Sequence, residues 1–232
     1  MDCLYFEDFF ISQPLFVNDH FPSNESWKIE IDKWLSCVHS LDKEYYERGK
    51  TRVKQDRWKR EEFLAEIRSI YYLESKLHCK ILELEPNRID FSFRDHSNAV
   101  WLAEVKCPSY VKELLERDNL KEKNLKRKMS PKYISGEGGS FDFKSGYTNA
   151  IKNSVQKFQS LENNLLIISD DRMISLITDP FAEENIVAEC ATHDLDHKIS
   201  AVLLLAVECR LDNKFYYLEK MIGISRSPVF SE

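Results

Sequence analysis

The sequence predicts an α/β (α+β) protein in which a central mixed sheet is flanked by helices. The first observation is a helical pattern of apolar residues over 58–78, and the second is a set of three short strand-like segments directly after it. The third is a later pair of helical patterns followed by two apolar strands. Hairpins are the simplest connection for the three consecutive strands, and helices are expected to cover the sheet that they begin.

The N-terminal quarter of the chain, 1–57, is expected to form a helical and irregular accessory region. Prolines and asparagines interrupt the aromatic residues of 1–25, which favours an irregular segment there. From Trp27 to about Arg57 the spacing of apolar residues is largely helical and fits either one helix or two. Packing on the core, binding of substrate and dimerisation are all open roles for this region.

The second region, 58–232, is expected to be the main domain. Its helix, 58–78, carries Phe63 and Leu64 in an uninterrupted amphipathic pattern. Strands are then predicted where residues alternate with period two or form apolar runs separated by turn signals such as Pro86-Asn87. The predicted strands are 80–85, 88–95, 99–107, 164–169 and 198–207.

Two helices and a loop are predicted between the third and fourth of these strands. A basic helix over 109–128 leads into a loop that holds four of the six glycines, and a second helix covers 147–161. The basic helix and the glycine-rich loop together span 109–146.

Net charge, cysteine spacing and the length of the apolar runs exclude several classes of function. The chain has 232 residues, 43% of them hydrophobic, and a formal net charge of −6, so no global basic field attracts nucleic acid or anionic lipid. The six cysteines form no C-x-x-C pair, which argues against zinc-ribbon and iron–sulfur sites and favours reduced thiols. The longest apolar run, 201–207, is far too short to cross a membrane, and the protein is expected to be cytoplasmic.

The stretch NAVWLAEVKCPSY, 98–110, places two ionisable groups, Glu104 and Lys106, inside an otherwise apolar strand. If residues 96–98 form a three-residue hairpin loop, Phe93 lies opposite Trp101 and Asp90 lies opposite Glu104. One face of the hairpin is then apolar, from Ile89 to Cys107, and the other is polar. A two-residue loop would instead place Asp90 opposite Ala103.

Two carboxylates in that register repel each other, so a cation is expected between them. Lys106 supplies one positive charge on the same face as Glu104. A divalent cation would supply more, and carboxylate oxygens are ligands suited to Mg²⁺ or Mn²⁺.

With Asp90 followed after 13 residues by Glu104-Val105-Lys106, the sequence resembles the D…(D/E)-x-K signature of the PD-(D/E)XK nuclease superfamily. The resemblance covers roughly 58–170 and implies a restriction-endonuclease-like core with the order αβββαβ. It also implies Mg²⁺-dependent hydrolysis of phosphodiester bonds, of DNA rather than RNA. The family pattern gives catalytic roles to Asp90, Glu104, Lys106 and a helical glutamate, which is Glu66 with Glu62 as the competitor, and assigns the metal to Asp90 and Glu104.

Contacts to nucleic acid are expected from basic and polar residues after this motif: Lys126, Arg127 and Lys128 in the basic segment, and Lys152 and Gln156 on the following helix. Each of these groups is also consistent with an ordinary solvated helix face. Two further functions remain open. One is a catalytically silent module that binds nucleic acid or a protein partner, and the other is an interaction protein such as an inhibitor. No membrane partner is expected, and a homodimer would suit two-strand cutting.

Overall fold

The structure is a computed structural model that describes residues 3–10, 24–55, 57–108, 143–154, 156–158, 163–169, 177–192, 198–209 and 214–224. The predicted basic helix, 109–128, and most of the glycine-rich loop lie outside these residues, as do Lys126, Arg127 and Lys128. None of the described helices is both long and apolar enough to cross a membrane. The five cysteines whose side chains are described form no disulfide.

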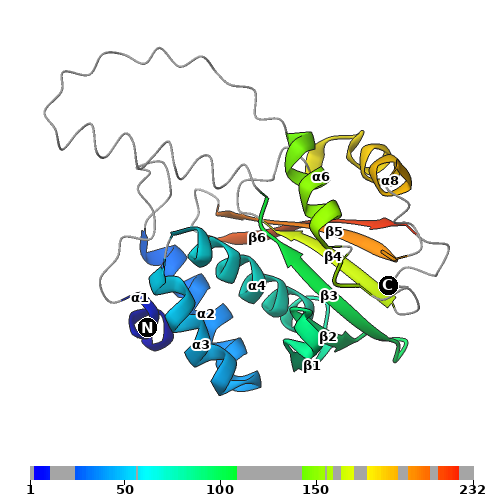
Figure 1. Cartoon of the computed structure of the whole chain (residues 1–232). Coiled ribbons are helices and arrows are strands. Elements are labelled where there is room, and N and C mark those ends of the chain that lie inside the picture. Colours follow the sequence, from blue (N-terminus) through cyan, green and yellow to red (C-terminus); the bar gives the residue numbers. More distant parts are fainter. Residues whose placement is uncertain are drawn as a thin grey trace, which may run out of the picture.

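A single six-stranded sheet forms the centre of the molecule (Figure 1). Its strands follow chain order across the sheet, with antiparallel pairs at both edges and parallel pairing from β3 to β5. The prediction of a mixed sheet is therefore confirmed. The strands are β1 (Lys80–Leu84), β2 (Phe91–Arg94), β3 (Val100–Lys106), β4 (Asn163–Ser169), β5 (Ala201–Cys209) and β6 (Phe215–Gly223).

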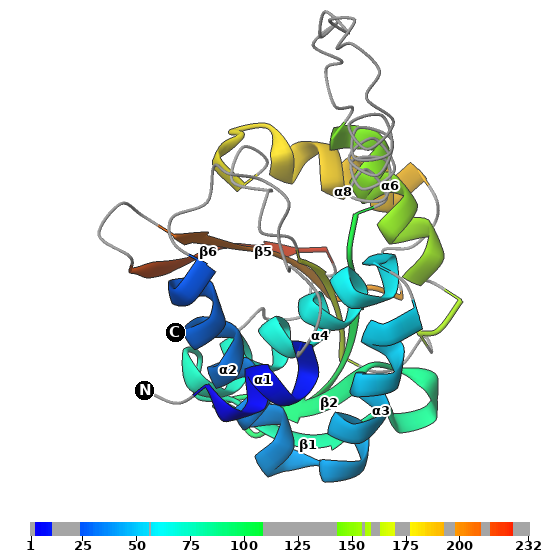
Figure 2. The ribbon, with the colours of Figure 1, turned by 90° about the vertical axis from the view of Figure 1, so that its left-hand side faces the viewer.

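Helices cover both faces of the sheet, and Figure 2 shows the sheet between the two helical layers. Four N-terminal helices share one hydrophobic core with one face, and the two later helices share a second core with the other face. The two later helices follow β3 and β4 in the chain, where parallel pairing requires a crossover connection. The first layer consists of α1 (Leu4–Phe10), α2 (Asn24–Leu41), α3 (Lys43–Gln55) and α4 (Arg57–Ser75), and the second of α6 (Phe143–Ser154) and α8 (Ala182–Thr192).

The N-terminal helices pack closely against the sheet. Trp34 of α2 donates a hydrogen bond from Nε1 to the hydroxyl of Tyr217 on β6 over 2.6 Å, and that hydroxyl donates to Glu30 over 2.5 Å. Phe9 of α1 stacks on Phe63 of α4 with ring centroids 5.4 Å apart. The prediction of an irregular segment over 1–25 is therefore wrong for the seven residues of α1, whose buried aromatic residues anchor a helix.

The β2–β3 hairpin has the predicted register. Phe91 lies opposite Ala103 and Phe93 lies opposite Trp101. The carboxylate of Asp95 holds the connecting loop, because it accepts hydrogen bonds from the backbone N–H groups of Ser97 and Ala99, from the Ser97 hydroxyl and from Trp101 Nε1. Asn98 adopts a left-handed φ of 67°, which is typical of the last residue of a three-residue hairpin loop.

The expected separation of the hairpin faces is only partly correct. Ladder pairing ends at Phe91 and Ala103, one residue before the expected pair of Asp90 and Glu104. A 3-10 turn, Pro86–Arg88, precedes Asp90, and left-handed φ values within it interrupt the alternation. Ile89 is therefore buried in the second core, beside α6, and not with Phe91 in the first.

Candidate active site

One cavity of about 680 Å³ lies at the carboxyl end of β3, between α4 and α6. Crevices at the carboxyl ends of parallel strands are common ligand sites in α/β sheets. Glu66, Asp90, Glu104 and Lys106, which are the four predicted catalytic residues, all line it. Lys152 and Gln156 do not line this cavity, and both are exposed.

Glu104 is the most deeply buried acid of the cavity, with a side chain that is 0% exposed. Its Oε1 receives the ammonium group of Lys106 and, over 2.5 Å, that of Lys157. Its Oε2 is buried and has no hydrogen-bond partner among the described residues. A buried carboxylate oxygen without a donor is costly, so this atom has an unmet demand for a proton donor or a cation.

Asp90 lies beside Glu104 without forming a cross-strand pair with it. Its Oδ2 accepts the backbone N–H of Val105 over 2.6 Å, and its Oδ1 is 3.8 Å from the Lys157 ammonium. Burial, and then the negative charges of Glu66 and Glu104, raise the pKa of Asp90 to about 8. Without an added cation this carboxyl is therefore largely protonated at neutral pH.

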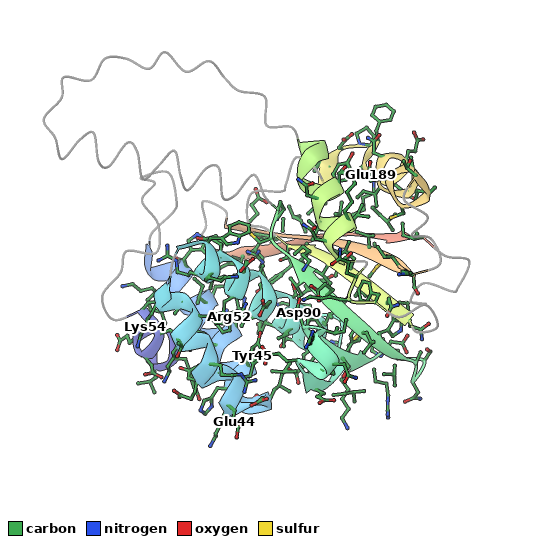
Figure 3. The ribbon with its side chains drawn as sticks, viewed as in Figure 1. Glu44, Tyr45, Arg52, Lys54, Asp90 and Glu189 are labelled. Carbon is green, nitrogen blue, oxygen red and sulfur yellow. The ribbon has the colours of Figure 1, made fainter. Side chains whose placement is uncertain are left out.

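Glu66, on α4, is held by two residues of α3. Arg52 binds both carboxylate oxygens over 2.6 Å, and the Tyr45 hydroxyl donates to Oε2 over 2.6 Å. Figure 3 labels Tyr45, Arg52 and Asp90. Tyr45 and Arg52 belong to α3 of the first helical layer, and Asp90 directly precedes β2 of the hairpin. The competing glutamate, Glu62, also lines the cavity and pairs with Lys59 over 2.7 Å.

Three residues of this constellation were not predicted from the sequence: Tyr45, Arg52 and Lys157. Lys157 follows α6 in a turn closed by the hydrogen bond from its own N–H to the carbonyl of Ser154. Although burial opposes its charge, the carboxylates of Asp90 and Glu104 raise the pKa of Lys157, so it stays cationic. The sequence around the end of α6 offered a signal, because Ile151, Ser154 and Phe158 are buried and Lys157 lies between the last two.

The donor set fits a divalent cation held by few protein ligands. Among the residues that the structure describes, no three histidine, cysteine, aspartate or glutamate side chains are grouped so that they could hold a metal ion. Two carboxylates, Asp90 and Glu104, are available, and Mg²⁺ is commonly bound through one or two carboxylates, several waters and substrate phosphates. The unpartnered Oε2 of Glu104 leaves one buried carboxylate oxygen without a donor, and burial together with the charges of Glu66 and Glu104 favours a proton or a cation at Asp90.

Comparison of the chain with protein-family models, with curated proteins and with solved structures finds no match.

Proposed function

We propose that this protein is a metal-dependent nuclease that hydrolyses phosphodiester bonds, of DNA rather than RNA. The observation that carries the proposal is the buried Glu104 carboxylate, with two ammonium groups on Oε1 and none on Oε2, in one cavity with Asp90. The element order α4-β1-β2-β3-α6-β4 and the motif Asp90…Glu104-Val105-Lys106 support a restriction-endonuclease-like core.

In this proposal Asp90 and Glu104 hold Mg²⁺ or Mn²⁺. When bound, such an ion lowers the pKa of a coordinated water and neutralises charge on the phosphoryl oxygens. Lys106 and Lys157 place two ammonium groups at the same carboxylate oxygen, so both are positioned to stabilise negative charge that develops on a phosphate in the cavity. Glu66, fixed by Arg52, supplies the negative field that keeps a proton or a cation at Asp90.

The test is cleavage of single-stranded and duplex DNA by the purified chain with Mg²⁺ or Mn²⁺, compared with EDTA. Lys106→Ala and Lys157→Ala are each expected to lower the rate about 10²–10³-fold, as for removal of one electrostatic stabiliser. Lys80→Ala is the matched control, because Lys80 is exposed on β1 away from the cavity. Equal rates for all three variants, or cutting that persists in EDTA, would refute the proposal.

A second candidate is a catalytically silent module that binds nucleic acid. It is favoured by the charge balance of the cavity, where Lys106 and Lys157 already neutralise Glu104 and Arg52 already neutralises Glu66. Such a module would cut nothing with any metal but would retain polynucleotide, with an affinity that falls as salt rises.

A further inference from the structure

Four residues at the cavity have no role in the chemistry above and no polar partner among the residues that the structure describes. These residues, which all line the cavity, are Trp58 on α4, Arg88 in the turn before β2, and Asn149 and Asn153 on α6. None of them makes a side-chain hydrogen bond or an ion pair with another described residue. Arg88, Asn149 and Asn153 are exposed, whereas Trp58 is half-buried and packs against the second hydrophobic core.

We infer that these residues bind an unpaired nucleobase beside the scissile phosphate, with the base stacked on the indole of Trp58. The inference rests on the proposed function and names its substrate class as single-stranded or locally unpaired DNA. An aromatic side chain gives each base a stacking surface whatever its identity, which suits a strand that is bound without sequence preference.

The size and shape of the cavity favour an unpaired base. About 680 Å³ lies within the ~300–1,000 Å³ typical of pockets for small molecules, which is the scale of a nucleotide and not of a duplex. In a duplex both faces of a base are covered by its neighbours. A side chain inside a concave site can therefore reach a face only when the base has left the stack.

The neighbouring side chains have the chemistry that such a nucleotide requires. Asn149 and Asn153 are four residues apart, so they lie on one face of α6, and each amide offers two N–H donors and a carbonyl acceptor to a base edge. The guanidinium of Arg88 is a donor fork suited to a flanking phosphate. Among the described residues that line the cavity, five are acidic and five are basic, so a bound divalent cation would make the cavity attractive to a phosphate.

The experiment measures binding of a fluorescent single-stranded DNA oligomer and of its duplex to the full chain, with Ca²⁺ in place of Mg²⁺ and with the oligomer checked for cleavage afterwards. The variants are Trp58→Ala and, as the matched aromatic control, Phe181→Ala, because Phe181 is 62% exposed and does not line the cavity. A series of oligomers with one abasic site at each position locates the stacked base.

The wild type is expected to bind the single strand more tightly than the duplex, and Trp58→Ala to weaken single-strand binding about 5- to 150-fold. One abasic position should cause a similar loss in the wild type and little further loss in Trp58→Ala, because both changes remove the same contact. Phe181→Ala should bind as the wild type does.

Tighter binding of the duplex, no binding of either DNA, an unchanged affinity in Trp58→Ala, or additive losses at every abasic position would overturn the inference. A parallel cleavage assay with Mg²⁺ and Mn²⁺ separates this failure from that of the proposed function. Stacking without cleavage removes only the nuclease proposal, and cleavage without an effect of Trp58 removes only the inference.

Discussion

Replacing Asp90 by asparagine tests the electrostatics of the cavity directly. Burial and the charges of Glu66 and Glu104 raise the pKa of Asp90 to about 8, so a negative charge at this position is costly in the folded chain. Asparagine has nearly the same shape, keeps an oxygen that can accept the Val105 N–H, and carries no charge at any pH.

The size of the effect follows from the difference between the folded pKa of about 8 and the ordinary value of 3.8. Each pH unit between the two corresponds to about 1.4 kcal/mol, so charging Asp90 in the folded state costs at most about 6 kcal/mol. Between pH 4 and pH 8 the folded chain keeps the proton that the unfolded chain has released. The free energy of unfolding of the wild type therefore falls as pH rises through this window and levels off above it.

The measurement is urea-induced unfolding of the wild type and of Asp90→Asn in EDTA at pH 5 and pH 9. We expect the variant to gain several kcal/mol relative to the wild type over this range. Mg²⁺ at 100 times its dissociation constant should then restore about 2.7 kcal/mol to the wild type at pH 9 and leave the variant unchanged.

The control is Glu83→Gln, because Glu83 is exposed on β1 and should follow the wild type at both pH values. If Asp90→Asn and the wild type lose stability in parallel from pH 5 to pH 9, Asp90 does not have the raised pKa on which the prediction depends. If Mg²⁺ stabilises both proteins equally, Asp90 is not part of a cation site.

Three further changes have defined outcomes. Hydrogen bonds lower the pKa of Asp95 despite its burial, so Asp95→Asn should cost about 1–2 kcal/mol of unfolding free energy at pH 7 and progressively less below pH 4, measured by urea unfolding. Gly49→Ala should destabilise the chain by about 1–3 kcal/mol in thermal unfolding, although helix propensity favours alanine, because its Cβ would lie 2.4 Å from Cζ of Phe63. Arg52→Met should lower the free energy of unfolding by about 2–3 kcal/mol in urea, less than the ~3–5 kcal/mol expected for a fully buried pair, because Arg52 is 26% exposed.

The hairpin was predictable because its determinants are local. Asp95 and Asn98 are residues that favour a tight loop, and the apolar alternation of the two strands admits few registers. The N-terminal helices α2 and α3 and the helix α4 were predictable from spacing for the same reason. The start of α6 at Phe143 extends into the predicted glycine-rich loop, because Gly146 lies within a helix that tertiary packing stabilises.

The strand β6 and the helix α8 were not predicted, because their patterns of apolar residues are weaker. Most residues of β6 are half-buried, and the charged Glu219 and Lys220 interrupt any apolar run, so the segment does not read as a strand by itself. Its nine pairs with β5, from Phe215 opposite Cys209 to Gly223 opposite Ala201, supply the stability that local sequence does not. The helix α8 has three buried residues among eleven and depends on the second core in the same way.

Glu66 lines the cavity and is hydrogen-bonded by residues of the N-terminal helix α3. The nuclease core that we propose begins near residue 58, but both oxygens of Glu66 are hydrogen-bonded by Tyr45 and Arg52 of α3. That fixed charge is the largest cause, after burial, of the raised pKa of Asp90. A carboxylate that is only 8% exposed needs hydrogen-bond donors, and here both donors come from α3. Since the protonation of Asp90 depends on Glu66, and the orientation of Glu66 depends on α3, the N-terminal helices belong to the proposed active site as much as to the fold.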